Sequence, residues 1–176
     1  MAARPPAIRV YGARCLRRRA EIVDPAAPGT PVLMDDLWLA LDADGGVGLA
    51  APQIDRSLRA LVIREPGKTR DKRRLELLNP ELVATFGPVV PFEEGCLSFP
   101  GLYTTVWRPR GVEVSYCDRA GDLQVLRDES LMARVVQHEM DHLDGILFID
   151  RVPRRRRWRL APRLLWLRMH GIMSGA

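Results

Sequence analysis

The chain has 176 residues but only three cysteines, three histidines and 6% aromatic residues, and it lacks an apolar run of membrane-spanning length. Three cysteines cannot all pair with one another, which argues against a disulfide framework. Residues 1–9 resemble neither a signal peptide nor a convincing organelle presequence. We therefore expect a cytoplasmic protein with no membrane partner and no specific DNA partner.

The composition is sufficient for one sizeable hydrophobic core. Hydrophobic residues make up 47% of the chain, and neither an internal repeat nor a break in composition divides it. We therefore expect one domain over residues 1–176, in which residues 152–176 form a basic C-terminal extension.

The most informative segment is Gln-His-Glu-Met-Asp-His at residues 137–142. On a helix, His138 and His142 leave the same face one turn apart, so both imidazoles can hold one metal ion. Glu139 lies beside them and can take a proton from water on that ion. Short patterns of this kind also occur by chance. In this chain, however, two of only three histidines stand at the spacing of metal ligands. The segment predicts a metal-dependent hydrolase.

The residues before this motif predict that its helix is buried. Leu131 and Val135 recur with the two histidines at helical spacing, which continues an apolar stripe. Asp128 or Ser130 is placed to cap the helix at its start, and Gly145 to end it. We expect the histidines to point into the molecule.

Two histidines leave a catalytic metal site one protein ligand short. Asp144 and Asp150 follow too closely to act as the distant ligand of a zinc endopeptidase. Upstream, residues 93–98 read Glu-Glu-Gly-Cys-Leu-Ser and offer the thiolate of Cys96 in a turn-like setting. A lone cysteine is more often a small buried apolar residue, as we expect for Cys15 and Cys117.

A third segment, residues 46–53, alternates small and apolar residues and ends in Gln53. It lacks the residues of a phosphate-binding loop, and by itself it is typical of a packed glycine turn. In this order, the three segments closely resemble the signature motifs of the peptide deformylase family. The resemblance runs over most of residues 8–151.

This resemblance implies an enzyme that removes the N-terminal formyl group from formylmethionyl nascent peptides and releases formate. It implies an α+β fold with mixed, largely antiparallel sheets around a central metal-binding helix, followed by a C-terminal helical tail. Cys96, His138 and His142 become the expected ligands of one divalent ion. The family implies Fe2+ as the physiological ion, although these ligand types also accept Zn2+, Ni2+ or Co2+.

The resemblance also implies roles for residues around the metal. Glu139 is expected to transfer the proton from water to the leaving amine. Gln53 and the backbone N–H of Leu97 are expected to stabilise the oxyanion, and Gly48 to line the substrate backbone. Val47, Leu131 and Val135 are candidates for an apolar methionine pocket, although core packing explains the last two almost as well.

Two further expectations concern charges near the site. The resemblance implies an ion pair between Arg108 and Asp141 that orients the helix. Tyr103 stands where some members of the family have an arginine near the peptide, so electrostatic capture of the far end of the substrate is not assumed.

Periodicity predicts the remaining elements. A helix is expected over residues 31–41, ending before the polar residues 42–45. Strands are expected at residues 59–63, 75–78, 111–117 and 123–126, with a charged loop at 65–74 and a hairpin turn at 121–122.

Eight arginines lie between Arg151 and Arg168. Such a run contacts RNA phosphates or an acidic surface, or is simply a solvated helix face. In some members of the family the C-terminal helix docks at the ribosome, and we expect such a contact here, although Pro162 breaks or restarts a helix. The alternatives to a deformylase are a zinc endopeptidase and a metal-stabilised ribosome-binding module without catalysis.

Overall fold

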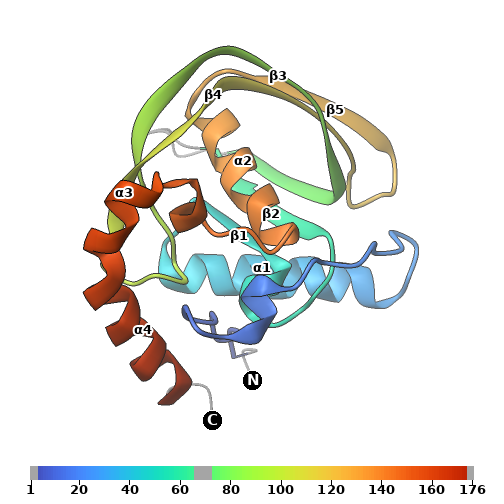
Figure 1. The fold of residues 1–176 in the computed structure, drawn as a ribbon. Coiled ribbons are helices and arrows are strands. Elements are labelled where there is room, and N and C mark those ends of the chain that lie inside the picture. Colours follow the sequence, from blue (N-terminus) through green and yellow to red (C-terminus); the bar gives the residue numbers. More distant parts are fainter. Residues whose placement is uncertain (1–3, 66–72, 174–176) are drawn as a thin grey trace.

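The computed structural model describes residues 4–65 and 73–173 (Figure 1). Its strands form one antiparallel sheet in the order β1-β2-β3-β4-β5. The predicted α+β class with largely antiparallel pairing is confirmed: all strand pairs of the sheet are antiparallel, and the isolated bridge between Glu21 and Leu58 is parallel. The strands are β1 (Gly48–Ala50), β2 (Ala60–Arg64), β3 (Arg74–Gly95), β4 (Tyr103–Cys117) and β5 (Leu123–Asp128).

Two of the strands are much longer than the sequence predicts. β3 and β4 pair from Leu78 with Cys117 to Gly95 with Tyr103, through three shifts of register. Such irregularities bend and twist a sheet, and the long hairpin curves over the helix beneath it (Figure 1). Residues 81–89 of β3 are largely exposed, so they carry no alternation of buried and exposed side chains that would mark a strand.

Helix α1 (Gly29–Asp44) packs beneath the sheet. Its prediction at residues 31–41 was wrong at the C-terminal end, because the helix continues through the polar residues. Gly45 ends it with a left-handed φ of 73°, a conformation that glycine adopts without steric cost. The side chains that it buries are mainly aliphatic, with Leu33, Met34, Leu37 and Leu41 among them.

Helix α2 (Leu131–Leu143) lies on the concave side of the curved hairpin (Figure 1). Ser130 is its N-cap and accepts a hydrogen bond from the Met132 N–H, and Gly145 follows its end with a φ of 70°. Both predicted ends of this helix are confirmed. One core cluster joins α2 to the sheet through Met132, Ala133, Val136, Met140 and Leu143.

The chain ends in a helical tail, as predicted. The short 3-10 turn Phe148–Arg151 leads into α3 (Arg154–Arg157), a 3-10 turn at Trp158–Leu160 and α4 (Ala161–Met173). Pro162 lies in the first turn of α4, where its missing N–H is tolerated, so it restarts the helix. Within the described residues no helix is both long and apolar enough to cross a membrane. The predicted loop at residues 65–74 lies mostly outside the described part of the chain.

Candidate active site

Cys96, His138 and His142 converge at one point in the fold. Cys96 lies in the turn that follows β3, and the two histidines lie on the buried face of α2. The three potential ligand atoms are all within 4.8 Å of one another, and 3.3 Å separates Cys96 Sγ from His142 Nε2. Donors bound to one ion at about 2.0–2.3 Å lie this close together. The sulfur and both rings therefore have the chemistry and the spacing to hold a divalent metal.

Glu94 orients one of these rings. His138 Nδ1 donates a hydrogen bond to Glu94 Oε2 over 3.0 Å, which leaves the other ring nitrogen for a metal. Burial by itself would raise the pKa of Glu94, but hydrogen bonds from His138 and Arg108 hold that pKa well below its ordinary value. This carboxylate is therefore ionised and supports the ligand, a role that the sequence analysis did not assign.

Two buried arginines hold Glu94 in place. Arg108 donates to both oxygens of Glu94, from Nε at 2.7 Å and from Nη2 at 3.0 Å. Arg134 on α2 donates to Glu94 Oε1 at 2.8 Å and to the carbonyl oxygen of Val90 at the same distance. Arg108 also reaches Asp141 Oδ2 at 2.7 Å, the ion pair that we expected. Arg151, to which the sequence analysis gave no role at this site, donates a hydrogen bond to the other oxygen of the same carboxylate, Asp141 Oδ1, at 2.5 Å.

Glu139 is a buried carboxyl beside the three ligands. Burial raises its pKa to about 7, and its Oε2 is a buried oxygen without a hydrogen-bond partner in the described structure. Its position depends on Gly48, because a Cβ atom there would lie 2.6 Å from Glu139 Oε1 and 2.8 Å from Val135 Cγ1. The glycine thus leaves room for a carboxyl group that reaches the cavity.

Gln53 is buried and points toward the sulfur. Its Oε1 accepts a hydrogen bond from the Ala50 N–H at 2.9 Å, which fixes the orientation of the amide. Its Nε2 then lies 3.1 Å from Ser98 Oγ and 3.6 Å from Cys96 Sγ. The segment predicted as a glycine turn instead forms strand β1 and a following 3-10 turn, and this arrangement places the amide N–H groups at the site.

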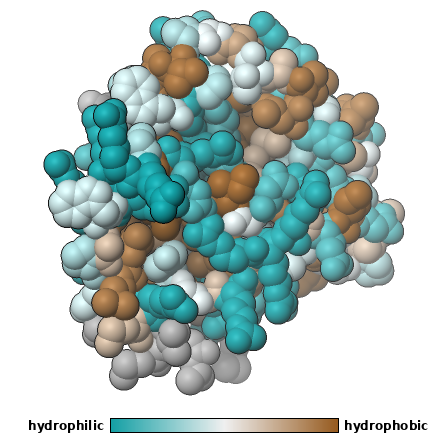
Figure 2. All heavy atoms as spheres, in the orientation of Figure 1, coloured by the Kyte–Doolittle hydropathy of each residue, from teal (hydrophilic) through white to brown (hydrophobic). Residues whose placement is uncertain are grey.

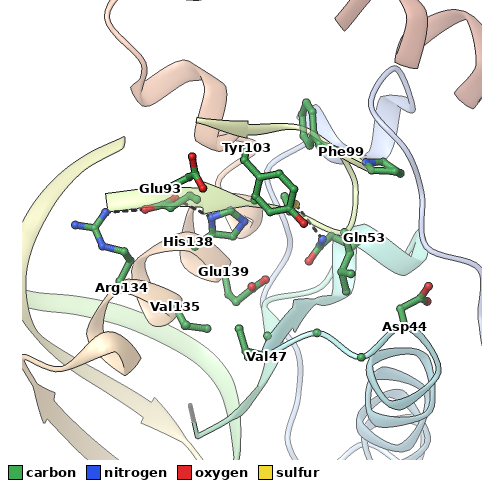
Figure 3. Close-up of a pocket in the computed structure, with 18 of the residues that line it drawn as sticks. Asp44, Val47, Gln53, Glu93, Phe99, Tyr103, Arg134, Val135, His138 and Glu139 are labelled. Atoms are coloured by element: carbon green, nitrogen blue, oxygen red, sulfur yellow. Dashed lines mark hydrogen bonds and ion pairs between the residues drawn. The ribbon is translucent and has the colours of Figure 1, made fainter. Parts of the chain in front are cut away.

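A cavity of about 570 Å³ opens beside these groups (Figure 3). Among its lining residues are all the substrate-binding candidates and both oxyanion candidates, namely Val47, Gly48, Gln53, Leu97, Leu131 and Val135. Val47 is 44% exposed and Leu131 is 45% exposed, so neither is a core residue, whereas Val135 is buried. An apolar wall that is open on one side suits an unbranched apolar side chain.

The rim of the cavity contains residues that the sequence analysis passed over. Phe92, Glu93 and Asp44 line it. Tyr103, which the sequence analysis placed near the peptide only by resemblance, also lines it, and its ring covers Gly95 and points toward Gln53 in Figure 3. A Cβ atom on Gly95 would lie 2.5 Å from that ring, so glycine is needed here for close approach. Phe92 and Tyr103 belong to the long exposed hairpin, where no local pattern marked them.

A family model described as polypeptide deformylase matches residues 5–158. The chain belongs to the polypeptide deformylase family. A peptide deformylase of Synechococcus sp. (strain RCC307) is 42% identical over 147 residues, which cover 84% of this chain and 73% of that protein. The peptide deformylase of Thermus thermophilus has a solved structure with 39% identity and a TM-score of 0.84, covering 95% of this chain and 99% of that chain. The one from Synechococcus elongatus, solved in complex with actinonin, has 38% identity and a TM-score of 0.85, covering 92% and 90%.

Membership confirms the predicted family, fold class and activity. The protein is an enzyme, a hydrolase that removes the formyl group from the N-terminus of nascent peptides. The family is metal-dependent, and Cys96, His138 and His142 form the candidate metal site. The family match ends at residue 158, inside the segment predicted as an extension from residue 152.

Proposed function

We propose that Cys96, His138 and His142 bind one divalent metal ion and that deformylation takes place in the adjoining cavity. The observation that carries this proposal is the convergence of the three donors within 4.8 Å at the wall of a cavity that also holds a buried carboxyl, Glu139. A thiolate with two imidazoles leaves an open position on the ion, as catalytic sites require.

We propose Fe2+ as the ion used in the cell, with Zn2+, Ni2+ and Co2+ as ions that the same ligands accept. Support for iron comes from the family, since the ligand types do not discriminate among these metals. Anaerobic purification, elemental analysis and a formate-release assay on one preparation test it. Activity that follows zinc content instead of iron content would contradict it.

The metal and Glu139 have different roles in the proposed hydrolysis. When bound, the metal lowers the pKa of water toward neutrality and polarises a carbonyl group. Glu139 accepts the proton of the attacking water and returns it to the leaving amine, so that formate and a free amino terminus are released. Its buried Oε2, which has no hydrogen-bond partner in the part of the chain that the structure describes, is free to make both transfers.

Gln53 and Leu97 stabilise the negative charge that develops on the formyl oxygen. The Gln53 amide is held by the Ala50 N–H and points its own N–H groups toward the sulfur, so it does not need to reorganise during the reaction. The backbone N–H of Leu97 follows Cys96 directly along the chain. Removing one such donor typically costs on the order of 3 kcal/mol in the activation barrier.

Methionine of the substrate lies against Val47, Leu131 and Val135, where its flexible thioether packs on aliphatic side chains. Gly48 lies at the floor of the same cavity and lines the peptide backbone. Because a related enzyme was solved with actinonin, we propose that this cavity also binds actinonin.

The decisive experiment measures formate release from a short formylmethionyl peptide by the purified chain and by Glu139→Gln. We expect the variant to retain its metal and to lose about 100-fold or more of its turnover, because a general base contributes this much. Cleavage of internal peptide bonds would instead indicate an endopeptidase. Full retention of metal without formate release by the unaltered chain would indicate a binding module.

We further propose that the enzyme works in the cytoplasm, on chains that emerge from the ribosome, and that its basic tail contacts the ribosome. The eight arginines of residues 151–168 support this proposal, and most of them are exposed. Such a contact raises the local concentration of the substrate.

A further inference from the structure

Five charged side chains of alternating sign form a row beside the candidate metal site. The row begins at Arg134 and passes through Glu94, Arg108 and Asp141 to Arg151. Each neighbouring pair is joined by an ion pair of 2.5 to 2.8 Å. Three arginines therefore share two buried carboxylates, which compensates both negative charges. We call these five residues the ion-pair row.

The row supports the metal site through both of its carboxylates. Glu94 Oε2 accepts the hydrogen bond from His138 Nδ1. Asp141 lies on α2 directly before His142. Arg108 joins the two carboxylates, because it donates to Glu94 from Nε and Nη2 and to Asp141 from Nη1. The position of this one guanidinium group therefore depends on both carboxylates at once.

Arg151 is the member of the row that reaches the surface. Its side chain is 45% exposed, whereas the other four side chains are at most 10% exposed. It donates to Asp141 Oδ1 at 2.5 Å and to Asp141 Oδ2 at 3.2 Å, a two-point contact that fixes the plane of the carboxylate. Without this contact, the buried charge of Asp141 would be left to Arg108, which also holds Glu94.

The turn that carries Arg151 packs against the site. This 3-10 turn places the ring centroid of Phe148 5.8 Å from that of His138. Asp150, in the same turn, pairs with Arg17, whose side chain is also 45% exposed. In Figure 2 hydrophilic side chains gather over α3, the helix that follows the turn in Figure 1. Two equally exposed arginines thus form ion pairs at this turn, and the pair of Arg151 is the one that ends on α2.

We propose that Arg151 is a positioning residue of the metal centre. It holds Asp141 in place, so that Arg108 remains on Glu94. Glu94 then keeps His138 in the orientation that binds the ion. This role rests on the proposed function, because it requires a metal ion at the three ligands. Arg151 lies outside the set of residues that line the catalytic cavity, so its effect is on the metal and not on the peptide.

The test follows the loss of Co2+ from the loaded enzyme to excess EDTA, by the absorption of the bound ion. Arg151→Gln keeps a polar side chain but removes the charge and the two-point contact. We expect it to lose Co2+ about tenfold faster or more, because outer partners of metal ligands contribute about 10- to 100-fold to metal affinity. Arg151→Lys keeps the charge without the two-point contact, so we expect about a threefold acceleration. Arg17→Gln, the matched control at the same turn, should stay within about twofold of the unaltered enzyme.

Two further measurements separate positioning of the metal centre from a general loosening of the turn. Both glutamine variants are expected to lower the unfolding temperature of the metal-free enzyme by similar amounts, since each removes one half-exposed ion pair. KM for a short formylmethionyl peptide is expected to change less than about twofold in Arg151→Gln, because Arg151 does not line the cavity.

Loss of Co2+ at the same rate from Arg151→Gln and from the unaltered enzyme would overturn the proposal. Equal acceleration in Arg151→Gln and Arg17→Gln would overturn it too, because the turn and not Asp141 would then be responsible. Loss at the unaltered rate from Arg151→Lys would also overturn it, which keeps the test decisive if the glutamine variant does not fold. In each case, formate release by the unaltered enzyme would leave the proposed function intact. An unaltered enzyme that binds no Co2+ would contradict the proposed function itself, and this proposal with it.

Discussion

At the scale of single residues, two buried carboxyl groups beside His138 have opposite properties. Glu94 accepts hydrogen bonds from Arg108, Arg134 and His138. Burial by itself would raise its pKa, but the bonds from His138 and Arg108 hold that pKa well below the ordinary value. Among the described residues no group donates a hydrogen bond to Glu139 Oε2, and burial raises the pKa of Glu139 to about 7. Environments that separate two pKa values in this way also give the two carboxyl groups different roles. Glu94 supports a metal ligand, and Glu139 is suited to exchange a proton.

The proposed methionine pocket is tested by Leu131→Asp. This position is 45% exposed and is the first residue of α2, where a negative charge is favourable, so the fold is expected to persist. Loss of the apolar contact is expected to lower kcat/KM for a formylmethionyl peptide about tenfold to a hundredfold, at unchanged metal content. Leu123→Asp, on the exposed edge strand, is the control. Equal loss of metal and turnover would indicate a structural role for Leu131.

The three cysteines are expected to differ in reactivity toward a thiol reagent at neutral pH. Burial and the nearby Asp55 raise the pKa of Cys15 to about 11, so it should react only on unfolding. Cys117 is half-buried and should react in the folded enzyme. Cys96 should become reactive when a chelator removes the metal. Counting modified thiols by mass spectrometry before and after chelation tests this, and a Cys96 that reacts equally in both states would contradict its role as a ligand.

At the scale of elements, α2 carries five of the proposed functional side chains, and two residues cap its start. Asp128 Oδ1 accepts hydrogen bonds from the Ser130 N–H at 2.7 Å and from the Ala133 N–H at 3.1 Å. Ser130 Oγ accepts one from the Met132 N–H at 3.2 Å. The sequence analysis offered these two residues as alternatives, and the structure uses both, because the first turn of a helix has several unpaired N–H groups.

Asp128→Ala and Ser130→Ala are each expected to lower the free energy of unfolding by about 1 kcal/mol, the usual cost of a lost cap. Because Ser130 also donates to Asp128, the double variant should lose less than the sum of the two. Urea denaturation measures the three values. Glu129→Ala, between them in the sequence and exposed, is the control. Additive losses would mean that the two caps act independently.

Elements with one buried face were predictable from the sequence, and the long hairpin was not. α2 repeats its apolar residues at helical spacing, so its existence and both of its ends followed from the pattern. Most of β3 beyond Pro80 is exposed and pairs with β4, so its strand structure depends on the other arm of the hairpin and not on a buried face of its own. Phe92 and Glu93 therefore entered the candidate site only through the fold.

At the scale of the whole molecule, the two ends of the chain are joined by ion pairs. Asp150, just before the tail, pairs with Arg17 from the N-terminal segment and accepts a hydrogen bond from the Leu147 N–H at 2.9 Å. Burial opposes ionisation of Asp150, but the hydrogen bonds from Arg17 and Leu147 outweigh it and lower its pKa below the ordinary value. Folding therefore favours the ionised carboxylate.

The contribution of Asp150 to stability is expected to depend on pH. Because its pKa is lower in the folded state, its stabilisation is complete above about pH 4 and disappears as the pH falls through the folded-state pKa. Asp150→Asn should thus cost on the order of 1 kcal/mol at pH 7 and less at pH 3. Thermal unfolding at both pH values measures this difference, with the exposed Asp122→Asn as control. A cost that is the same at both pH values would show that the charge is not responsible.

The amino-acid sequence by itself determined the three signature segments, the spacing of the two histidines on one helix face, and the basic charge of the C-terminal tail, because each of these is local in the chain. Only the tertiary structure decided which groups meet across long separations. It brought Cys96 to within 3.3 Å of His142, surrounded Glu94 with two arginines, and packed the two ends of the chain against each other. The contacts of Cys96 and Glu94 with α2 depend on the bend of β3 and β4 over that helix, and packing between distant segments leaves no periodic signal in either one.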